Sequence, residues 1–477
     1  MLESSFSSRL WFRGCFAVKK EPPISNSLSV LIFLMLVGTF MLVACIFANV
    51  KHPALDVPPA RQNKDGVFYD NIAFCLAAGD GFSIDFQDPL WRSRYEAFNQ
   101  QTLHKGFYDW VLKFQGQGPT TMRAPGYPVF LLGIYQAFGW NWAWARLVGC
   151  LAMAVGLAAL LTLVWRRVGF LPASIACISI LLDYSIMESG GTIASESLAI
   201  GVLALVCVTL INAWEKPSNI RWAIAGLFFA ILMLVRSNWN LGLLLLIAAS
   251  LLVLIPRVRT ALLPVTPRHL LFFFSACIVV AAPWWIRNCW LTHQAQPFGT
   301  AGANGLVGAY CDSSWENYGN WQNQPMIENQ KKVRKNLPVT TLTLAEQEAL
   351  TGQASIQKAK TWVGTNLEKI PPLMLFRFIS HWGLTNASVP LPFRILNVGF
   401  ILIALTSAVL IRSRWLTILI ILLAIDAMMV MLTWAHVGRY GIPMRPLLHI
   451  YFGMALAAMI MQIINRRPPI DLEADHS

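Results

Sequence analysis

Ten apolar runs divide most of the chain. Each run has about 17 to 25 residues, which is the length an α-helix needs to cross the hydrocarbon core of a bilayer. The pattern therefore predicts an all-α polytopic membrane protein with about ten transmembrane helices, in a range of 10–13. The runs are residues 28–49, 146–165, 170–188, 191–213, 220–236, 239–256, 268–286, 393–411, 414–434 and 444–464.

Basic residues orient these runs. Cytoplasmic loops of membrane proteins carry an excess of Lys and Arg, and five basic clusters fall at alternate connections. Placing all five in the cytoplasm closes the count at ten spans, with residues 1–26 and 465–477 as cytoplasmic tails. The clusters are Arg166/Arg167, Lys216/Arg221, Arg257/Arg259/Arg268, Arg412/Arg414 and Arg466/Arg467.

Two shorter apolar stretches, 125–139 and 371–382, do not fit this alternation. The second stretch also contains Arg377 and His381. Both are short for a span, and counting the first as one would move a basic cluster to the outer side. We expect both to be interfacial or re-entrant helices on the outer face.

The outer face then carries two long polar segments. The first is the loop 50–145, which belongs to a transmembrane module covering 27–286 and holds eight of the chain's 24 acidic residues. The second is the segment 287–392, which precedes C-terminal membrane helices at 393–464. A loop as long and polar as the first is more than a connector, so we expect the chemistry at the outer face.

Composition agrees with a membrane protein and excludes several classes. Hydrophobic residues make up 56% of the chain and charged residues 13%, against ~25% charged in an average globular protein. The net charge of +13 is explained by basic cytoplasmic loops, and no soluble basic face with interleaved aromatic residues is present to bind nucleic acid. Nucleotide-binding, serine-hydrolase and zinc-protease motifs are absent. Cys289 and Cys311 flank an outer stretch, so a disulfide between them is possible.

Asp65 is the first candidate for chemistry. Phe68, Ile72 and Leu76 have the spacing of a short amphipathic helix lying along the membrane, and Asp65 would stand near its N-terminus. Asp65 is then either an N-cap or an exposed carboxylate that acts as a general base or metal ligand. The local sequence does not separate these two interpretations.

Arginines at the outer ends of the runs are the second group. Arg123 precedes a proline-rich stretch, Arg236 and Arg287 close two spans, and Arg439 precedes the last span. A single arginine at a membrane interface is usually an anchor whose head reaches the headgroups. Several arginines that converge beside acids could instead hold a phosphate, to which the planar guanidinium group is suited.

In this order the motifs resemble the integral-membrane glycosyltransferases of the GT-C fold. The closest resemblance is to the group containing protein O-mannosyltransferases, lipid A aminoarabinose transferases and bacterial glycosyltransferase-39-like proteins, and it extends over residues 28–464. The motifs that carry it are Asp65 and Tyr69 before Gly79-Asp80-Gly81-Phe82, Arg123-Ala124-Pro125-Gly126-Tyr127-Pro128, Ser195-Glu196, Arg236, Pro283-Trp284 with Arg287-Asn288, and Arg439-Tyr440 before Pro443 and Pro446.

The resemblance implies a GT-C type bundle with extracytoplasmic interfacial helices. It also implies an enzyme that moves a sugar from a polyprenyl-phosphate donor to an extracytoplasmic lipid, polysaccharide or protein by inverting displacement. The many Lys and Arg residues assigned to the cytoplasmic side and the compact loops favour a bacterial inner membrane. The donor, membrane lipid and an unnamed acceptor are the expected partners, and nucleic acid is not.

The resemblance further implies roles for single residues. Asp65 is expected to be the catalytic base, and Glu196 to orient an arginine or the sugar. Where the family often has a second acid after the aspartate, this chain has Gly66, which argues against a metal there; a divalent metal is possible as a cofactor. The expected substrate-binding residues are Tyr69, Asp70, Arg123, Tyr127, Arg236, Arg287, Arg439 and Tyr440.

Two functions from other classes compete with this hypothesis. A lipid or lipid-linked-sugar transporter or flippase would carry internal repeats and polar, broken helices near the membrane midplane. We find no repeat, and the polar groups gather at the outer ends of the spans. A noncatalytic envelope assembly protein would tolerate the loss of Asp65.

Overall fold

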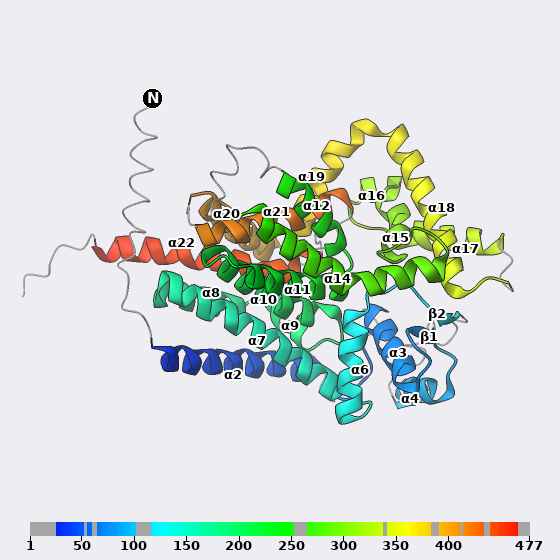
Figure 1. Ribbon diagram of the computed structural model, residues 1–477, viewed down its shortest axis with the longest axis horizontal. Helices are drawn as coiled ribbons and strands as arrows, with labels where there is room; N and C mark the ends of the chain where they lie inside the picture. Colours follow the sequence, from blue (N-terminus) through cyan, green and yellow to red (C-terminus); the bar gives the residue numbers. More distant parts are fainter. Residues whose placement is uncertain are drawn as a thin grey trace, which may run out of the picture.

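The computed structural model describes residues 25–51, 55–59, 64–101, 116–251, 265–336, 341–382, 391–410, 414–433 and 439–465. This part of the chain is helical apart from one small two-stranded sheet. The long helices form a bundle, and shorter helices gather at one of its ends (Figure 1). The prediction of an all-α polytopic membrane fold is confirmed.

All ten predicted apolar runs contain helices. Among the described residues, six helices are long and apolar enough to cross a membrane. The run 170–188 is broken into α8 and α9, which are bent by 68° and would add a seventh span. The count of ten stays a prediction, because three further apolar helices are shorter than a span. The bundle helices are α2 (Asn26–Lys51), α7 (Trp142–Val168), α8 (Phe170–Leu181), α9 (Tyr184–Gly190), α10 (Ser195–Glu215), α11 (Asn219–Val235), α12 (Trp239–Leu251), α14 (Pro267–Thr292), α20 (Leu391–Leu410), α21 (Arg414–Leu432) and α22 (Arg445–Asn465).

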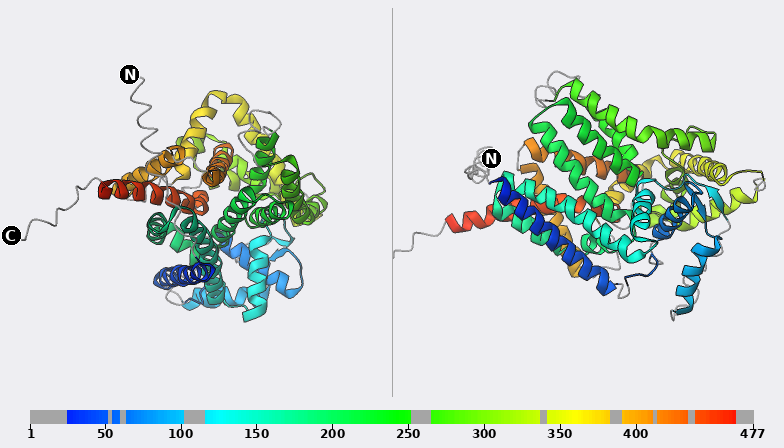
Figure 2. Two further views of the ribbon diagram at one scale, coloured as in Figure 1. Left: turned by 60° about the vertical axis from the view of Figure 1, so that its left-hand side comes forward. Right: turned by 60° about the horizontal axis from the view of Figure 1, so that its bottom comes forward.

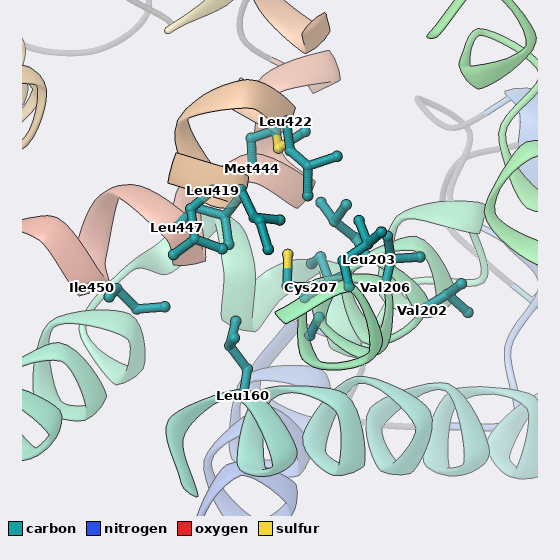
Figure 3. Packing of buried hydrophobic residues seen from close by; sticks show 14 of the residues in the cluster. Leu160, Val202, Leu203, Val206, Cys207, Leu419, Leu422, Met444, Leu447 and Ile450 are labelled. Atoms are coloured by element: carbon teal, nitrogen blue, oxygen red, sulfur yellow. The ribbon is translucent and has the colours of Figure 1, made fainter. Parts of the chain in front are cut away.

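The centre of the bundle is a continuous apolar core. Leu160 of α7 and Leu203 of α10 face Leu419 of α21 and Leu447 of α22, all fully buried (Figure 3). Close helix contact depends on small residues, as is common in membrane proteins. A Cβ atom on Gly156 of α7 would lie 2.2 Å from the Gly201 carbonyl oxygen of α10, so these helices cross with their backbones in contact.

The outer surface of the bundle is apolar as well. Large side chains such as Met35 on α2 and Val279 on α14 are exposed. Only 11% of the apolar window of α2 and 17% of that of α14 is buried within the protein. A bilayer is the environment that covers such surfaces, and the chain is an integral membrane protein.

The two predicted outer segments lie at the same end of the bundle. Helices α3, α4, α15, α17 and α18 gather there, on the side opposite the start of α2 and the end of α22 (Figures 1 and 2). That this end lies outside the cytoplasm stays a prediction. The first segment contains α3 (Lys64–Ala78), β1 (Ser83–Asp85), α4 (Pro89–Gln101), β2 (Gln117–Pro119) and α6 (Gly126–Phe138); the second contains α15 (Ala301–Ala309), α16 (Asp312–Glu316), α17 (Asn323–Lys335), α18 (Leu344–Thr365), η2 (Leu367–Lys369) and α19 (Ile370–His381), and η3 (Arg439–Met444) precedes α22.

Helix α3 is not the surface helix that its sequence predicts. Val67, Ile72 and Ala73 are fully buried on it, whereas Phe68 is only partly buried. The reason is that α3 packs against α6 and β1, so its neighbours cover most of its sides. The two strands pair antiparallel, with Ser83 opposite Pro119, and hold the loop after α3 against the chain that leads to α6.

The structure also bears on the two short apolar stretches and on the cysteine pair. The stretches 125–139 and 371–382 form helices α6 and α19 as predicted, and their depth in a membrane stays a prediction. The disulfide that the sequence left possible is not formed, since Cys289 and Cys311 are both free thiols. The Cys311 sulfur instead lies 3.3 Å from the Ser313 hydroxyl. The tails beyond 25 and 465 lie outside the described residues.

Candidate functional site

Five charged side chains that are far apart in the sequence meet at the end of the bundle where the outer helices gather. Four of them lie at the ends of helices, and the fifth lies in a loop. Asp65 lies in the first turn of α3, Arg123 in the loop before α6, Glu196 in the first turn of α10, Arg236 at the C-cap of α11 and Arg439 at the start of η3. All five were expected site residues.

The five groups alternate in charge. Arg123 Nη2 lies 2.7 Å from Asp65 Oδ1, and Arg439 Nη1 lies 2.9 Å from Asp65 Oδ2. Arg439 Nε donates to Glu196 Oε1 at 2.5 Å, and Arg236 Nη1 lies 3.4 Å from the same oxygen. Three guanidinium groups against two carboxylates leave the cluster one net positive charge. We call these five residues the Asp65 cluster.

Local structure explains why the two acids stand there. Asp65 and Glu196 occupy the first turns of their helices, where the helix dipole favours negative charge. The chain reaches α10 through a break after α9, and this break packs closely on α2. A Cβ atom on Gly191 would lie 2.5 Å from the Ala48 Cβ, so only glycine fits there.

The five side chains of the Asp65 cluster differ in how far they are buried. The side chains of Glu196 and Arg236 are 5% and 6% exposed, whereas those of Arg123, Asp65 and Arg439 are 20%, 26% and 31% exposed. Arg123, Asp65 and Arg439 are therefore within reach of a ligand. Glu196 and Arg236 support them from inside.

The cluster has hydrogen-bonding capacity to spare. Three of its buried polar atoms, Arg123 Nε, Glu196 Oε2 and Arg236 Nη1, make no hydrogen bond, and Arg236 Nη1 has only its ion-pair contact with Glu196. The hydroxyl of the neighbouring Tyr127 makes no hydrogen bond either. A buried polar group without a partner costs about 1–3 kcal/mol, so these atoms are available to contact a polar ligand.

Aromatic rings line the same place. The Arg236 guanidinium lies 5.3 Å from the centre of the Tyr440 ring, and the rings of Tyr69 and Tyr127 meet edge to face at 5.1 Å. Burial and the negative charge of Asp65 raise the pKa of Tyr69. Tyr69 therefore stays a neutral hydroxyl near neutral pH.

Asp70, another expected substrate ligand, has a different environment. Its carboxylate is fully buried and accepts hydrogen bonds from five aromatic side chains, which occupies its lone pairs. This geometry makes Asp70 an anchor of α3 rather than a ligand for substrate. The donors are Trp91 Nε1 at 3.1 Å, Tyr95 Oη at 2.8 Å, Tyr135 Oη, Trp140 Nε1 at 3.1 Å and Trp142 Nε1 at 2.9 Å.

Arg287 makes its hydrogen bonds and its ring contact outside the Asp65 cluster. It donates to the Phe82 carbonyl oxygen at 2.8 Å and to that of Thr120 at 3.1 Å, and it stacks over Trp284. Since the strands are antiparallel with Ser83 opposite Pro119, these two carbonyl groups lie at the same end of the small sheet, and Arg287 ties the end of α14 to that end. Its expected role as a phosphate ligand stays a prediction.

One charged group was missed from the sequence. Asp183 caps α9 and accepts from Arg445 Nε at 2.6 Å and from His449 Nε2 at 3.0 Å, both on α22. These contacts pin the bend between α8 and α9 to the last helix. An Asp followed by a helical pattern is an N-cap signal, and it could have predicted the bend.

The described residues contain no group of three or more His, Cys, Asp or Glu side chains that could hold a metal ion. The possible divalent metal stays a prediction.

No protein-family model and no curated protein matches this sequence. Among solved structures, the chain is similar to ArnT from Cupriavidus metallidurans bound to undecaprenyl phosphate, with a TM-score of 0.38 and 12% identity over 94% of this chain and 82% of that chain. It is also similar to the apo state of the same ArnT, with a TM-score of 0.36 and 15% identity over 91% of this chain and 81% of that chain. At this level of similarity neither structure assigns a role to any residue of this chain.

Proposed function

We propose that this protein is a membrane glycosyltransferase that transfers a sugar from a polyprenyl-phosphate donor to an extracytoplasmic acceptor. The observation that carries the proposal is the Asp65 cluster. It combines a carboxylate that solvent can reach with three guanidinium groups and an excess of one positive charge. A general base and a cationic phosphate site are the two parts that such a transfer needs.

The position of the cluster fits a lipid-linked donor. It lies at the ends of apolar helices, so a prenyl chain can stay in the bilayer while its phosphate enters the cluster. Arg123 and Arg439 are the exposed cations, and their planar groups suit a phosphate. Both are already paired with Asp65.

This pairing suggests how binding prepares the base. The donor phosphate competes with the Asp65 carboxylate for Arg123 and Arg439, and its binding frees an oxygen of Asp65. Asp65 then accepts the proton of an acceptor hydroxyl. The hydroxyl oxygen bonds to the anomeric carbon from the face opposite the phosphate, the carbon–oxygen bond to phosphate breaks, and polyprenyl phosphate leaves with the electron pair.

Glu196 has a supporting part in this proposal. It is buried and contacts both Arg236 and Arg439. It therefore holds two guanidinium groups in place while a third partner, the phosphate, enters. Tyr69, Tyr127 and Tyr440 form the aromatic wall against which the sugar lies.

The test is sugar transfer from a panel of polyprenyl-phosphate sugars to an envelope extract by the full-length protein in lipid nanodiscs. We expect transfer by the wild type and a loss of about 10²- to 10⁴-fold in Asp65→Asn, the usual contribution of a general base. Asp88→Asn is the matched control, because Asp88 caps α4 and Asn caps equally well. Full transfer by a folded Asp65→Asn protein removes Asp65 as the base.

A lipid or lipid-linked-sugar transporter is the second candidate, favoured by the bent pair α8 and α9, since broken helices are typical of transporters. A transporter moves the donor across the bilayer and leaves its sugar attached. Vesicles loaded with the donor separate the two functions, because only a transferase releases free polyprenyl phosphate. A noncatalytic assembly protein does neither.

A further inference from the structure

Behind the Asp65 cluster lies a second buried network, centred on Glu348 of α18. Its carboxylate is 4% exposed and accepts from the Thr120 hydroxyl at 2.6 Å and from the Thr121 backbone N–H at 2.9 Å. The hydroxyl groups of Thr121 and Thr300 both lie 3.3 Å from Oε2. Three of these four contacts are to the two residues after β2.

The same two residues are held from other sides. The Thr300 N–H donates to the Thr121 carbonyl oxygen at 3.2 Å, and Arg287 donates to that of Thr120. Gly299 lies directly on this segment with a φ of +82°, and a Cβ atom there would be 2.4 Å from the Thr121 oxygen. Both peptide carbonyl groups and both hydroxyl groups are thus fixed by residues of α14, of α18 and of the segment between these two helices.

Arg123 follows this segment after a single intervening residue, Met122. It stands in a loop without regular structure between β2 and α6. The far end of that loop is also fixed, because Gly126 packs on the backbone of α11, where a Cβ atom would lie 2.8 Å from Leu234. The guanidinium group that meets Asp65 is therefore carried by a short loop clamped at both ends.

The buried face of α18 shows that a charge is not needed merely to pack this helix. Apart from Glu348 it is formed by small or neutral side chains that face α15 and its surroundings. Burial raises the pKa of Glu348, and the donors from Thr120, Thr121 and Thr300 lower it again. A buried carboxylate is expensive, and this one is directed at the residues before Arg123.

We propose that Glu348 is a positioning residue that sets Arg123 against Asp65 through Thr120 and Thr121. The part of Arg123 in donor binding rests on the proposed function; the clamp itself does not. Through this clamp the second outer segment contributes to a site whose charged groups all come from elsewhere in the chain.

The first arm of the test measures backbone protection by hydrogen–deuterium exchange in the full-length protein. Glu348→Gln replaces one acceptor oxygen by an NH₂ group that faces donors. We expect faster exchange in the peptide that covers 117–125. Glu346→Gln is the control, because Glu346 lies on the same helix and contacts Thr343 and His293 rather than this loop. Unchanged exchange in a folded Glu348→Gln protein overturns the clamp.

The second arm is a double-mutant cycle on kcat/KM for transfer. We expect Glu348→Gln to lower kcat/KM roughly 10- to 100-fold, the range for a misplaced catalytic contact. Combined with Arg123→Ala, it should add nothing to the loss from Arg123→Ala alone. Multiplying losses, or full activity in Glu348→Gln when Arg123→Ala is impaired, overturns the positioning role.

Two further comparisons distinguish a failure of the clamp from misfolding of Glu348→Gln and from a failure of the proposed function. Thr120→Val removes one donor with little change in volume, and it should reproduce both effects if Glu348→Gln does not fold. If the wild type transfers sugar from no donor, the proposed function fails. The exchange arm then decides by itself whether Glu348 holds the loop.

Discussion

Asp65 and Asp70 stand on the same helix, five residues apart, and have opposite surroundings. Asp65 is 26% exposed and meets two arginines. Asp70 is fully buried among five neutral aromatic donors. The difference shows that the partners of an acid, rather than its place in a motif, decide whether it can do chemistry. A partly exposed carboxylate among cations can exchange these partners for a ligand. A buried carboxylate whose lone pairs are all occupied can only stabilise the structure.

The geometry of a helix explains the difference. Each residue turns the helix by about 100°, so five residues place two side chains about 140° apart. Asp65 therefore faces the loop of Arg123 and the start of η3. Asp70 faces α4 and α6 on the other side. The motif indicated that both acids lie near the site and did not indicate which one meets the arginines.

The largest expected effect is the loss of stability when the Asp70 carboxylate, the anchor of α3, is removed. Asp70→Ala leaves five aromatic donors without their acceptor, and buried donors without a partner cost about 1–3 kcal/mol each. We expect the free energy of unfolding to fall by at least about 3 kcal/mol, seen as a lower apparent Tm in detergent. The exposed Glu96→Ala on α4 is the control. Equal Tm values for Asp70→Ala and the wild type would show that the five donors find other partners.

The next effect concerns the inner support of the cluster. Arg236→Ala removes a buried cation beside Glu196, and loss of one preorganised charge typically lowers turnover about 10²-fold or more. We expect a higher donor KM or a lower kcat without a large fall in Tm. Arg236→Lys keeps the charge without the planar fork and should recover only part of the activity. Unchanged kinetics in a folded Arg236→Ala protein remove Arg236 from the site.

A smaller effect uses Glu348 as a third acid for comparison. Like Asp70 it is buried among neutral donors, and burial raises its pKa above the ordinary 4.5. A raised pKa in the folded state means that its contribution to stability is complete below pH 4.5 and is lost as the pH rises through the folded pKa. The apparent Tm of the wild type minus that of Glu348→Gln should therefore be larger at pH 5 than at pH 8.

The control for this pH effect lies two residues away. Hydrogen bonds from Thr343 lower the pKa of Glu346 below 4.5, so its contribution is lost only at more acidic pH. The Tm difference between the wild type and Glu346→Gln should be flat from pH 5 to pH 8. An equal slope for both variants would assign the pH effect to another group.

The smallest expected effect concerns the thiols. Cys289 and Cys311 are free, so a reducing agent should leave transfer and Tm unchanged. Alkylation and mass mapping without reduction should find both residues modified. A pair of peptides that stays linked until it is reduced would show that the disulfide left possible by the sequence does form.

Much of the site could be predicted from the sequence, because its charged residues lie at helix ends that apolar runs define. The order of motifs brought Asp65, Arg123, Glu196, Arg236 and Arg439 together, and the structure gives them direct contacts. The bend at Asp183 was missed because the apolar run is continuous through it. An N-cap was the only local signal.

Glu348 could not be found in this way. It lies on a polar helix with no special pattern, and its partners Thr120 and Thr121 are more than 220 residues away in the chain. Such a contact depends on how the second outer segment folds back over β2, and this follows from tertiary packing. For the same reason the sequence left the Cys289–Cys311 disulfide open, since two cysteines beside one outer stretch need not be neighbours in space.

The most direct test of the account is to measure donor binding and transfer together in Asp65→Asn and Arg123→Ala. Polyprenyl phosphate in nanodiscs serves as the binding probe. If Asp65 is a base that the phosphate displaces from its arginines, Asp65→Asn loses transfer and binds polyprenyl phosphate at least as tightly as the wild type, whereas Arg123→Ala loses both. An Asp65→Asn protein that transfers sugar normally, or that loses binding as Arg123→Ala does, would contradict the account.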